Sequence, residues 1–129
     1  MTRKLLIDTD ILVDFLRGFP KAVKYLKTRS EEILVSAITV AELYAGVRDD
    51  ERRHLDDLIS LFEVVPISRE IAVTGGLFKQ QYHKSPGVGL ADAIIAATSV
   101  KSEAELKTLN TKHFPMIKGL RSPYLKNYS

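Results

Sequence analysis

The stretch Leu5-Leu6-Ile7-Asp8-Thr9-Asp10 decides the fold class. Its three consecutive apolar residues are typical of a strand that is buried on both faces, as in a parallel sheet. The apolar residues after Asp10 predict a helix that ends near Gly18. A strand that passes directly into a helix places Asp8 at the strand's carboxyl end, where open α/β sheets bind their ligands.

Short apolar segments alternate with amphipathic segments of helix length along the rest of the chain. We expect further strands at 33–36, 64–67 and 105–109, and further helices at 21–29, 40–47, 49–62, 68–82 and 90–100, with an irregular tail at 110–129. Ser68 is the expected N-cap of its helix. The alternation predicts an α/β fold in three layers (α/β/α), with a mainly parallel sheet and a single domain spanning 1–129.

The composition excludes several classes of function. The chain has no cysteine, which excludes disulfides, thiol catalysis and thiolate metal sites. The three histidines show no metal-ligand spacing, so a metal would be held mainly by oxygen atoms. No apolar run is long enough to span a bilayer, and the apolar segment after Lys4 is too short for a signal peptide. We therefore expect a cytoplasmic protein, which the lack of cysteine fits.

The net charge of +3 is unevenly distributed. Five basic residues and no acid lie between 15 and 30, and six basic residues lie between 101 and 129. The segment 31–70 holds ten acids against four arginines. The two basic segments could form a phosphate-binding rim, and solvated helix faces explain them equally well.

Asp92 is the single most informative residue. It is the only charged residue between 87 and 100, in a strongly apolar helix, and a buried carboxylate is costly unless it is paired, hydrogen-bonded or bound to a metal. On a helical wheel it lies beside Val88, Ala96 and Ser99, which leave room next to it. We interpret Asp92 as functional. The alternative is an exposed acid that the helix dipole favours in the first turn.

Three other acids have simpler explanations when each is taken alone. Glu42 forms a capping-box pattern with Thr39. Asp8 could be an ordinary residue at the end of a strand, and an N-cap role for Asp10 is favoured over metal ligation. Glu42, however, like Asp8, closely follows the end of a predicted strand. The two acids and Asp92 are therefore expected to approach one point.

Carboxylates that approach one point repel each other and raise each other's pKa unless a cation neutralises them. Oxygen ligands of this kind suit Mg²⁺ or Mn²⁺. Such an ion can polarise a phosphodiester and activate a water molecule. The implied chemistry is metal-assisted cleavage of a nucleic-acid backbone.

Four segments together resemble a PIN domain. They are Leu-Ile-Asp-Thr-Asp at 6–10, Ser-Ala-Ile-Thr-Val-Ala-Glu-Leu-Tyr-Ala-Gly at 36–46, Leu-Ala-Asp-Ala-Ile-Ile-Ala-Ala at 90–97, and Thr-Leu-Asn-Thr-Lys-His-Phe at 108–114. Each segment is a weak signal, whereas four in this order are a strong one. The sequence is most similar to the VapC-type toxin ribonucleases of toxin–antitoxin pairs.

The resemblance implies a set of site residues. Asp8, Glu42 and Asp92 match the family's acidic metal-binding positions for Mg²⁺ or Mn²⁺. Asn110 falls where many members carry a fourth acid and others an asparagine, and it completes the candidate catalytic set without adding negative charge. Asp10 stands where members often have a neutral residue, so it could partly compensate for Asn110.

The neighbouring polar residues have implied supporting roles. Thr9 and Thr108 match hydroxyl positions that orient water molecules or carboxylates. His113 lies in the family's Asn-x-x-[His/Asp]-Phe segment, where we expect a structural role, with Phe114 packed inward.

The implied activity is that of a metal-dependent endoribonuclease, the toxin of a type II toxin–antitoxin pair. The resemblance also implies an RNA substrate, a homodimer and a small antitoxin protein as a partner. Leu43 and Tyr44 are candidate contact residues for that partner, although a place in the core explains them equally well.

Two other interpretations compete with the nuclease, and the sequence argues against the first and leaves the second open. A phosphatase that uses Asp8 as a phosphoryl acceptor would need threonine at position 12, which is Leu12. A non-catalytic RNA- or protein-binding module on the same fold would tolerate neutralisation of the acids. Fold alone does not separate these alternatives.

Overall fold

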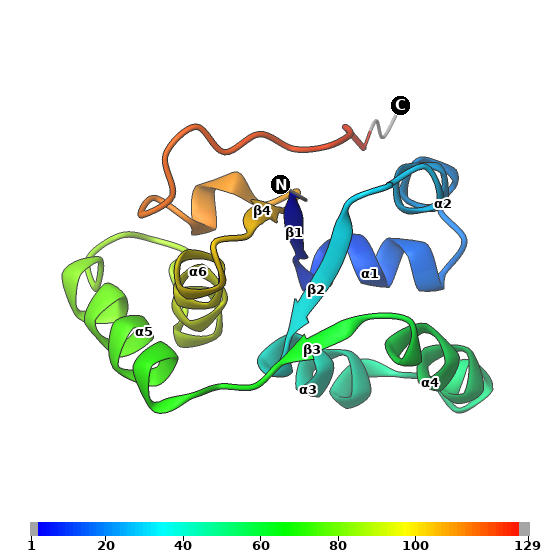
Figure 1. Cartoon of the computed structure of the whole chain (residues 1–129), viewed down its shortest axis with the longest axis horizontal. Helices are drawn as coiled ribbons and strands as arrows, with labels where there is room; N and C mark the ends of the chain where they lie inside the picture. Colours follow the sequence, from blue (N-terminus) through cyan, green and yellow to red (C-terminus); the bar gives the residue numbers. More distant parts are fainter. Residues whose placement is uncertain (1–2, 127–129) are drawn as a thin grey trace.

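A four-stranded sheet lies at the centre of the computed structural model, which describes residues 3–126 (Figure 1). Its strands are β1 (Lys4–Ile7), β2 (Glu32–Ser36), β3 (Glu63–Val65) and β4 (Glu105–Lys107), arranged in the order β3-β2-β1-β4. All three neighbouring pairs are parallel. The predicted parallel sheet is therefore confirmed.

Helices cover both faces of this sheet. They are α1 (Thr9–Leu16), α2 (Pro20–Lys27), α3 (Ala37–Gly46), α4 (Arg52–Ser60), α5 (Arg69–Gln81) and α6 (Leu90–Ser102), with short 3₁₀ turns η1 (Asp49–Glu51) and η2 (Thr111–His113). In Figure 1, α5 and α6 lie on one side of the sheet and α1 to α4 on the other. None of the helices within residues 3–126 has the length and apolar character needed to cross a membrane.

The side chains of β1 alternate between two apolar cores, because successive residues of a strand point to opposite faces. Leu5 and Ile7 pack with residues of α1 to α4, and Leu6 packs with residues of α6 and the segment after η2. All three are fully buried. The three predicted layers are therefore confirmed, and the sheet is held from both sides next to Asp8.

Element boundaries differ from the prediction where local chemistry intervenes. The expected helix at 49–62 is divided into η1 and α4. The third strand ends at Val65, before Pro66, whose nitrogen cannot donate to a sheet. Ser68 caps α5 as predicted, since its hydroxyl accepts a hydrogen bond from the N–H of Ile71 at 3.1 Å. The tail is irregular after η2 as far as residue 126, and residues 127–129 lie outside the described part of the chain.

The strand-to-helix connections bring polar residues to one edge of the sheet. β1 is followed by Asp8 and α1, β2 leads directly into α3, and β4 is followed by Thr108. Because the strands are parallel, these connections all lie at the carboxyl end of the sheet.

Candidate active site

Asp8 links the end of β1 to the start of α1. Its Oδ1 accepts a hydrogen bond from the N–H of Thr9 at 2.8 Å, which makes Asp8 the N-cap of α1. Its Oδ2 accepts a hydrogen bond from the hydroxyl of Thr108 at 2.7 Å. Asp8 is only 5% exposed, and Thr108 is fully buried. The carboxylate is thus fixed by donors from two elements.

The predicted N-cap role of Asp10 is wrong. Asp10 lies inside the first turn of α1, because the helix already begins at Thr9. Its Oδ1 accepts from the N–H of Ile11 at 2.8 Å, and its Oδ2 accepts from the N–H of Leu109 at 2.9 Å. Asp10 therefore connects α1 to the segment that follows β4.

The capping-box interpretation of Glu42 is also wrong. α3 begins at Ala37, and its N-cap is Ser36, whose hydroxyl accepts from the N–H of Ile38 at 3.2 Å. Glu42 instead lies near the middle of α3, where its Oε1 accepts a hydrogen bond from the hydroxyl of Thr9 at 2.7 Å. Thr9 therefore connects the start of α1 with the exposed carboxylate of α3.

Asp92 lies in the first turn of α6, as the helix-dipole alternative required. Its Oδ2 accepts from the N–H of Gly89 at 3.2 Å, and its side chain is 23% exposed. It is nevertheless close enough to Asp8 for its charge to raise the pKa of that carboxyl. Asp92 therefore caps its own helix and also belongs to the acidic cluster.

His113 approaches Asp92, a contact that the sequence did not reveal. The Nδ1 of His113 lies 3.5 Å from Oδ2 of Asp92, and the other edge of the ring faces Gly87. The Asn-x-x-His-Phe segment was the only local signal for this residue. Phe114 is fully packed in the core beside it, as predicted.

Asn110 reaches the same edge of the sheet. Its N–H donates to the hydroxyl oxygen of Thr108 at 3.0 Å, and its side chain is exposed. Since Thr108 donates its own proton to Asp8, the backbone of Asn110 is two hydrogen bonds away from the Asp8 carboxylate. The structure therefore brings all four predicted site residues to one edge.

The electrostatics of this edge are unfavourable to ionised acids. Burial and, to a lesser extent, the charges of Asp10 and Asp92 raise the pKa of Asp8 to about 7, although hydrogen bonds from Thr108 and Thr9 act to lower it. Burial also raises the pKa of Asp10. Such a cluster favours a bound cation, because a cation would offset the desolvation and the repulsion.

The donor atoms suit a hard divalent cation, but they do not form a complete ligand set in this arrangement. Within residues 3–126, no three His, Cys, Asp or Glu side chains are placed so that they could hold a metal ion together. All candidate donors are carboxylate or amide oxygens, which are the ligands that Mg²⁺ and Mn²⁺ prefer. The chemistry of the residues therefore fits such an ion, and their assignment as ligands stays a prediction.

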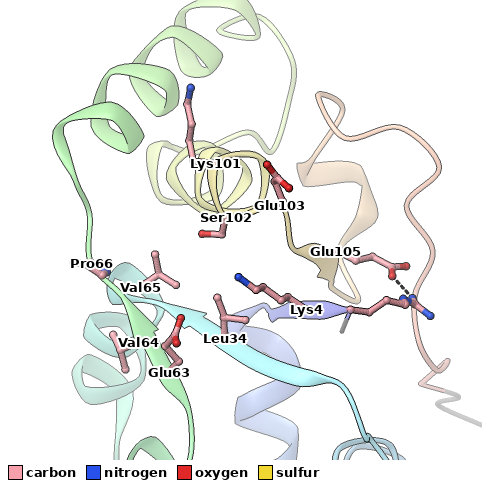
Figure 2. A pocket seen from close by; sticks show the side chains of 11 residues that line it. Lys4, Leu34, Glu63, Val64, Val65, Pro66, Lys101, Ser102, Glu103 and Glu105 are labelled. Carbon is pink, nitrogen blue, oxygen red and sulfur yellow. Dashed lines mark hydrogen bonds and ion pairs between the residues drawn. The ribbon is translucent and has the colours of Figure 1, made fainter. Parts of the chain in front are cut away.

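A cavity of about 900 Å³ opens along β3, from the start of β1 to Pro66 beyond the end of β3. Figure 2 shows it between β3, the start of β1 and the end of α6, with Lys4, Leu34 and Glu63 among its lining residues. The candidate site acids do not line it. The acidic edge and this cavity are thus separate features of the sheet.

The model of the PIN domain family matches residues 5–118 of the chain. The chain belongs to the PIN-domain family. This PIN domain is 40% identical over 123 residues to Ribonuclease VapC19 of Mycobacterium tuberculosis, an alignment that covers 92% of this chain and 98% of the relative. It is 36% identical to Ribonuclease VapC10 of the same organism, over 93% of this chain and 92% of the relative.

A solved structure supports the same grouping. A chain of a toxin-antitoxin complex from Klebsiella pneumoniae superposes with a TM-score of 0.81 and 33% identity, covering 93% of this PIN domain and 98% of that chain. The resemblance to VapC proteins and the α/β fold predicted from the sequence are both confirmed.

Proposed function

We propose that this PIN-domain protein is a Mg²⁺- or Mn²⁺-dependent endoribonuclease that acts as the toxin of a toxin–antitoxin pair. The observation that carries the proposal is the buried Asp8 carboxyl at the carboxyl end of β1, whose pKa is raised to about 7 beside Asp10 and Asp92. The relatives named as ribonucleases support RNA as the substrate class.

Asp8, Glu42 and Asp92 would hold the metal ion. When bound, the ion supplies activation of a water molecule and neutralisation of phosphate charge. Asp8 is already fixed by two hydrogen bonds. Glu42 is held by Thr9, and the Oδ2 of Asp92 is engaged by Gly89 N–H, which leaves its Oδ1 for the site.

The protein's own residues orient these groups and the substrate. The Thr108 hydroxyl sets the direction of the Asp8 carboxylate, and the exposed Asn110 amide offers a carbonyl oxygen and an N–H to a phosphate or a water molecule. Basic residues of the segments 15–30 and 101–126 would attract the RNA backbone, so binding should weaken as the salt concentration rises. Hydrolysis by water leaves a 5′-phosphate and a 3′-hydroxyl.

The proposed partners are a second copy of this chain and a small antitoxin protein. The similar chain from Klebsiella pneumoniae comes from a toxin-antitoxin complex. Of the two contact residues considered from the sequence, Leu43 is buried in the core, whereas Tyr44 reaches the surface and its hydroxyl donates to Asp56 at 2.5 Å. Tyr44 is therefore the better candidate for contact with an antitoxin.

The decisive experiment is cleavage of a mixed RNA pool by the purified chain, with Mg²⁺ or Mn²⁺ and with EDTA. We expect metal-dependent cuts with 5′-phosphate ends, which are lost in Asp8→Asn and Asp92→Asn. Glu105→Gln is the matched control, because Glu105 is an acid at the opposite end of the sheet.

The outcomes separate the alternatives. Cleavage that survives EDTA and both aspartate variants would place the site elsewhere. A folded protein that cleaves no RNA with either metal would favour a non-catalytic binding module, in agreement with the neutral Asn110 and the incomplete ligand set.

A further inference from the structure

We infer that Asp10 is a positioning residue whose carboxylate clamps the segment Thr108–Asn110 against the start of α1, and that it is not a ligand that replaces the missing fourth acid. The inference rests on the proposed function, because it assigns a role within the same site. From the sequence alone, the negative charge of Asp10 could partly compensate for the neutral Asn110.

The first argument is that both oxygens of Asp10 are already used by backbone donors. Oδ1 accepts from the N–H of Ile11 at 2.8 Å, and Oδ2 accepts from the N–H of Leu109 at 2.9 Å. The hydroxyl oxygen of Thr108 lies 3.3 Å from the same Oδ2. Both donors are backbone N–H groups that cannot turn away from a cation, whereas the Thr108 hydroxyl on Oδ2 of Asp8 can rotate. The Leu109 donor also comes from a different part of the chain, so the carboxylate joins two segments of the site.

The second argument is the place of this clamp in the sheet. The last hydrogen bond between β1 and the edge strand β4 joins the N–H of Asp8 to the carbonyl of Lys107 at 2.9 Å. Beyond that point the strands no longer pair, and the Asp10–Leu109 bond is the next connection between them. Asp10 therefore extends the attachment of β4 to the residues that carry the site.

The third argument is the chain of bonds from the clamp to Asp8. The Thr108 hydroxyl has one proton, which it donates to Asp8 at 2.7 Å, and its oxygen accepts from the N–H of Asn110 at 3.0 Å. Leu109 lies between these two residues and is held by Asp10. Release of Leu109 would free both the hydroxyl that orients Asp8 and the backbone that carries the Asn110 amide.

The test compares Asp10→Ala with Asp10→Asn in the full chain. Alanine removes the clamp, whereas the amide oxygen of asparagine can still accept from Leu109 and gives up only the bond from Ile11. We expect the Leu109 amide of the metal-free protein to exchange its hydrogen at least about tenfold faster in Asp10→Ala than in the wild type, and within about threefold of it in Asp10→Asn.

Two functional measurements complete the test. We expect Asp10→Ala to lower kcat for RNA cleavage by roughly tenfold to a hundredfold with KM within about threefold, as for other groups that orient metal ligands. Asp10→Asn should restore kcat to within about fivefold of the wild type. Its affinity for Mn²⁺, measured by calorimetry without RNA, should stay within about threefold of the wild type.

Asp14→Asn is the matched control, since Asp14 is a buried acid one turn further along α1 that has no bond to Leu109. It should leave the exchange of the Leu109 amide and the cleavage rate unchanged. A loss of Mn²⁺ affinity in Asp10→Asn as large as in Asp8→Asn would overturn the inference in favour of direct ligation. An unchanged Leu109 amide in Asp10→Ala would overturn it in favour of no role.

The exchange measurement needs neither metal nor RNA. Failure of the proposed nuclease function would appear as a wild type without cleavage, whereas failure of the clamp would appear in the Leu109 amide of the variants.

Discussion

Two buried aspartates of the same helix, Asp8 at the N-cap of α1 and Asp14 within it, show how differently this fold treats negative charge. Asp14 is 7% exposed, its Oδ1 accepts from Lys126 at 2.8 Å, and its Oδ2 accepts from the Tyr124 hydroxyl at 2.9 Å. Asp8 is 5% exposed, and within residues 3–126 no basic side chain forms an ion pair with it. Its charged neighbours that matter most are Asp10 and Asp92.

The two acids differ in their partners: Asp14 forms an ion pair that holds the C-terminal segment, whereas Asp8 lies beside other acids. Around Asp14 the C-terminal segment is anchored, because Tyr124 packs on Phe19 with ring centroids 5.9 Å apart and Lys21 donates to the carbonyl of Leu125 at 2.7 Å. The charge of Asp14 is thereby neutralised within the fold. The charge of Asp8 has no basic partner within residues 3–126, which is consistent with the proposed binding of a cation there.

The strongest test of this contrast is the pH dependence of stability without metal. The pKa of Asp8 is 3.8 in the unfolded reference and about 7 in the fold. The protonated form is thus favoured by folding, so its contribution to stability is complete below about pH 4 and is lost as the pH rises through about 7. We expect a loss on the order of a few kcal/mol between these limits. Urea unfolding at a series of pH values measures it.

Asp8→Asn is the control for this pH series. The variant cannot ionise at position 8, so the wild-type decrease between pH 4 and 8 should be largely absent from it. Saturating Mg²⁺ should reduce the decrease in the wild type, because a cation favours the ionised form. Identical pH profiles for the wild type and the variant would mean that the charge of Asp8 is compensated after all.

A second test removes the compensated charge. Asp14→Ala leaves the Tyr124 hydroxyl without its acceptor, while Lys126, whose side chain is 30% exposed, can turn to solvent. We expect a loss of about 2 kcal/mol in the free energy of unfolding, mostly from the hydroxyl and the lost packing. Tyr124→Phe should lose about half as much. If Asp14→Ala were as stable as the wild type, the C-terminal segment would not depend on this acid.

The sequence predicted the sheet well because burial on both faces leaves a direct signature. Leu5 to Ile7 read as a doubly buried strand, and they alternate between the two cores. The position of Asp8 at the carboxyl end of β1 could be predicted from that strand alone. The structural reason is that a parallel strand and its following helix determine where the next polar side chain lies.

The helix starts were predicted less well, because capping patterns are short and occur more than once in the same segment. Thr39 and Glu42 match a capping box. However, β2 ends at Ser36, and the hydroxyl of Ser36 caps α3, which therefore begins before Thr39. Asp8 and Asp10 are both suitable caps for α1, and pairing of the Asp8 N–H with β4 decides between them. Only the tertiary structure supplies that information.

Contacts between distant segments left no local pattern. His113 meets Asp92 across the loop that precedes α6, and Thr9 meets Glu42 between two helices. These contacts involve ordinary polar residues whose neighbours in sequence are uninformative. They decide how the acids around Asp8 are oriented, and they could be identified only from the fold.

The smallest expected effect tests whether the protein also positions the third acid. Gly87 has φ +84°, and a Cβ there would lie 3.0 Å from Cδ2 of His113 and 3.3 Å from its Nε2. Gly119 has φ +73° and nothing within 4 Å. Alanine at either position costs a similar backbone strain of about 1 kcal/mol. Only Gly87→Ala should displace His113, which lies 3.5 Å from Asp92.

We therefore expect Gly87→Ala to lower Mn²⁺ affinity and kcat/KM for RNA by roughly threefold to tenfold, the range expected for a group that orients a metal ligand. Gly119→Ala should reduce the free energy of unfolding by a similar amount while leaving both functional values unchanged. Calorimetry and cleavage assays on the two variants make the comparison. If the variants behaved alike, the cap from Gly89 would be sufficient to hold Asp92, and the contact with His113 would have no part in arranging the acids that face Asp8.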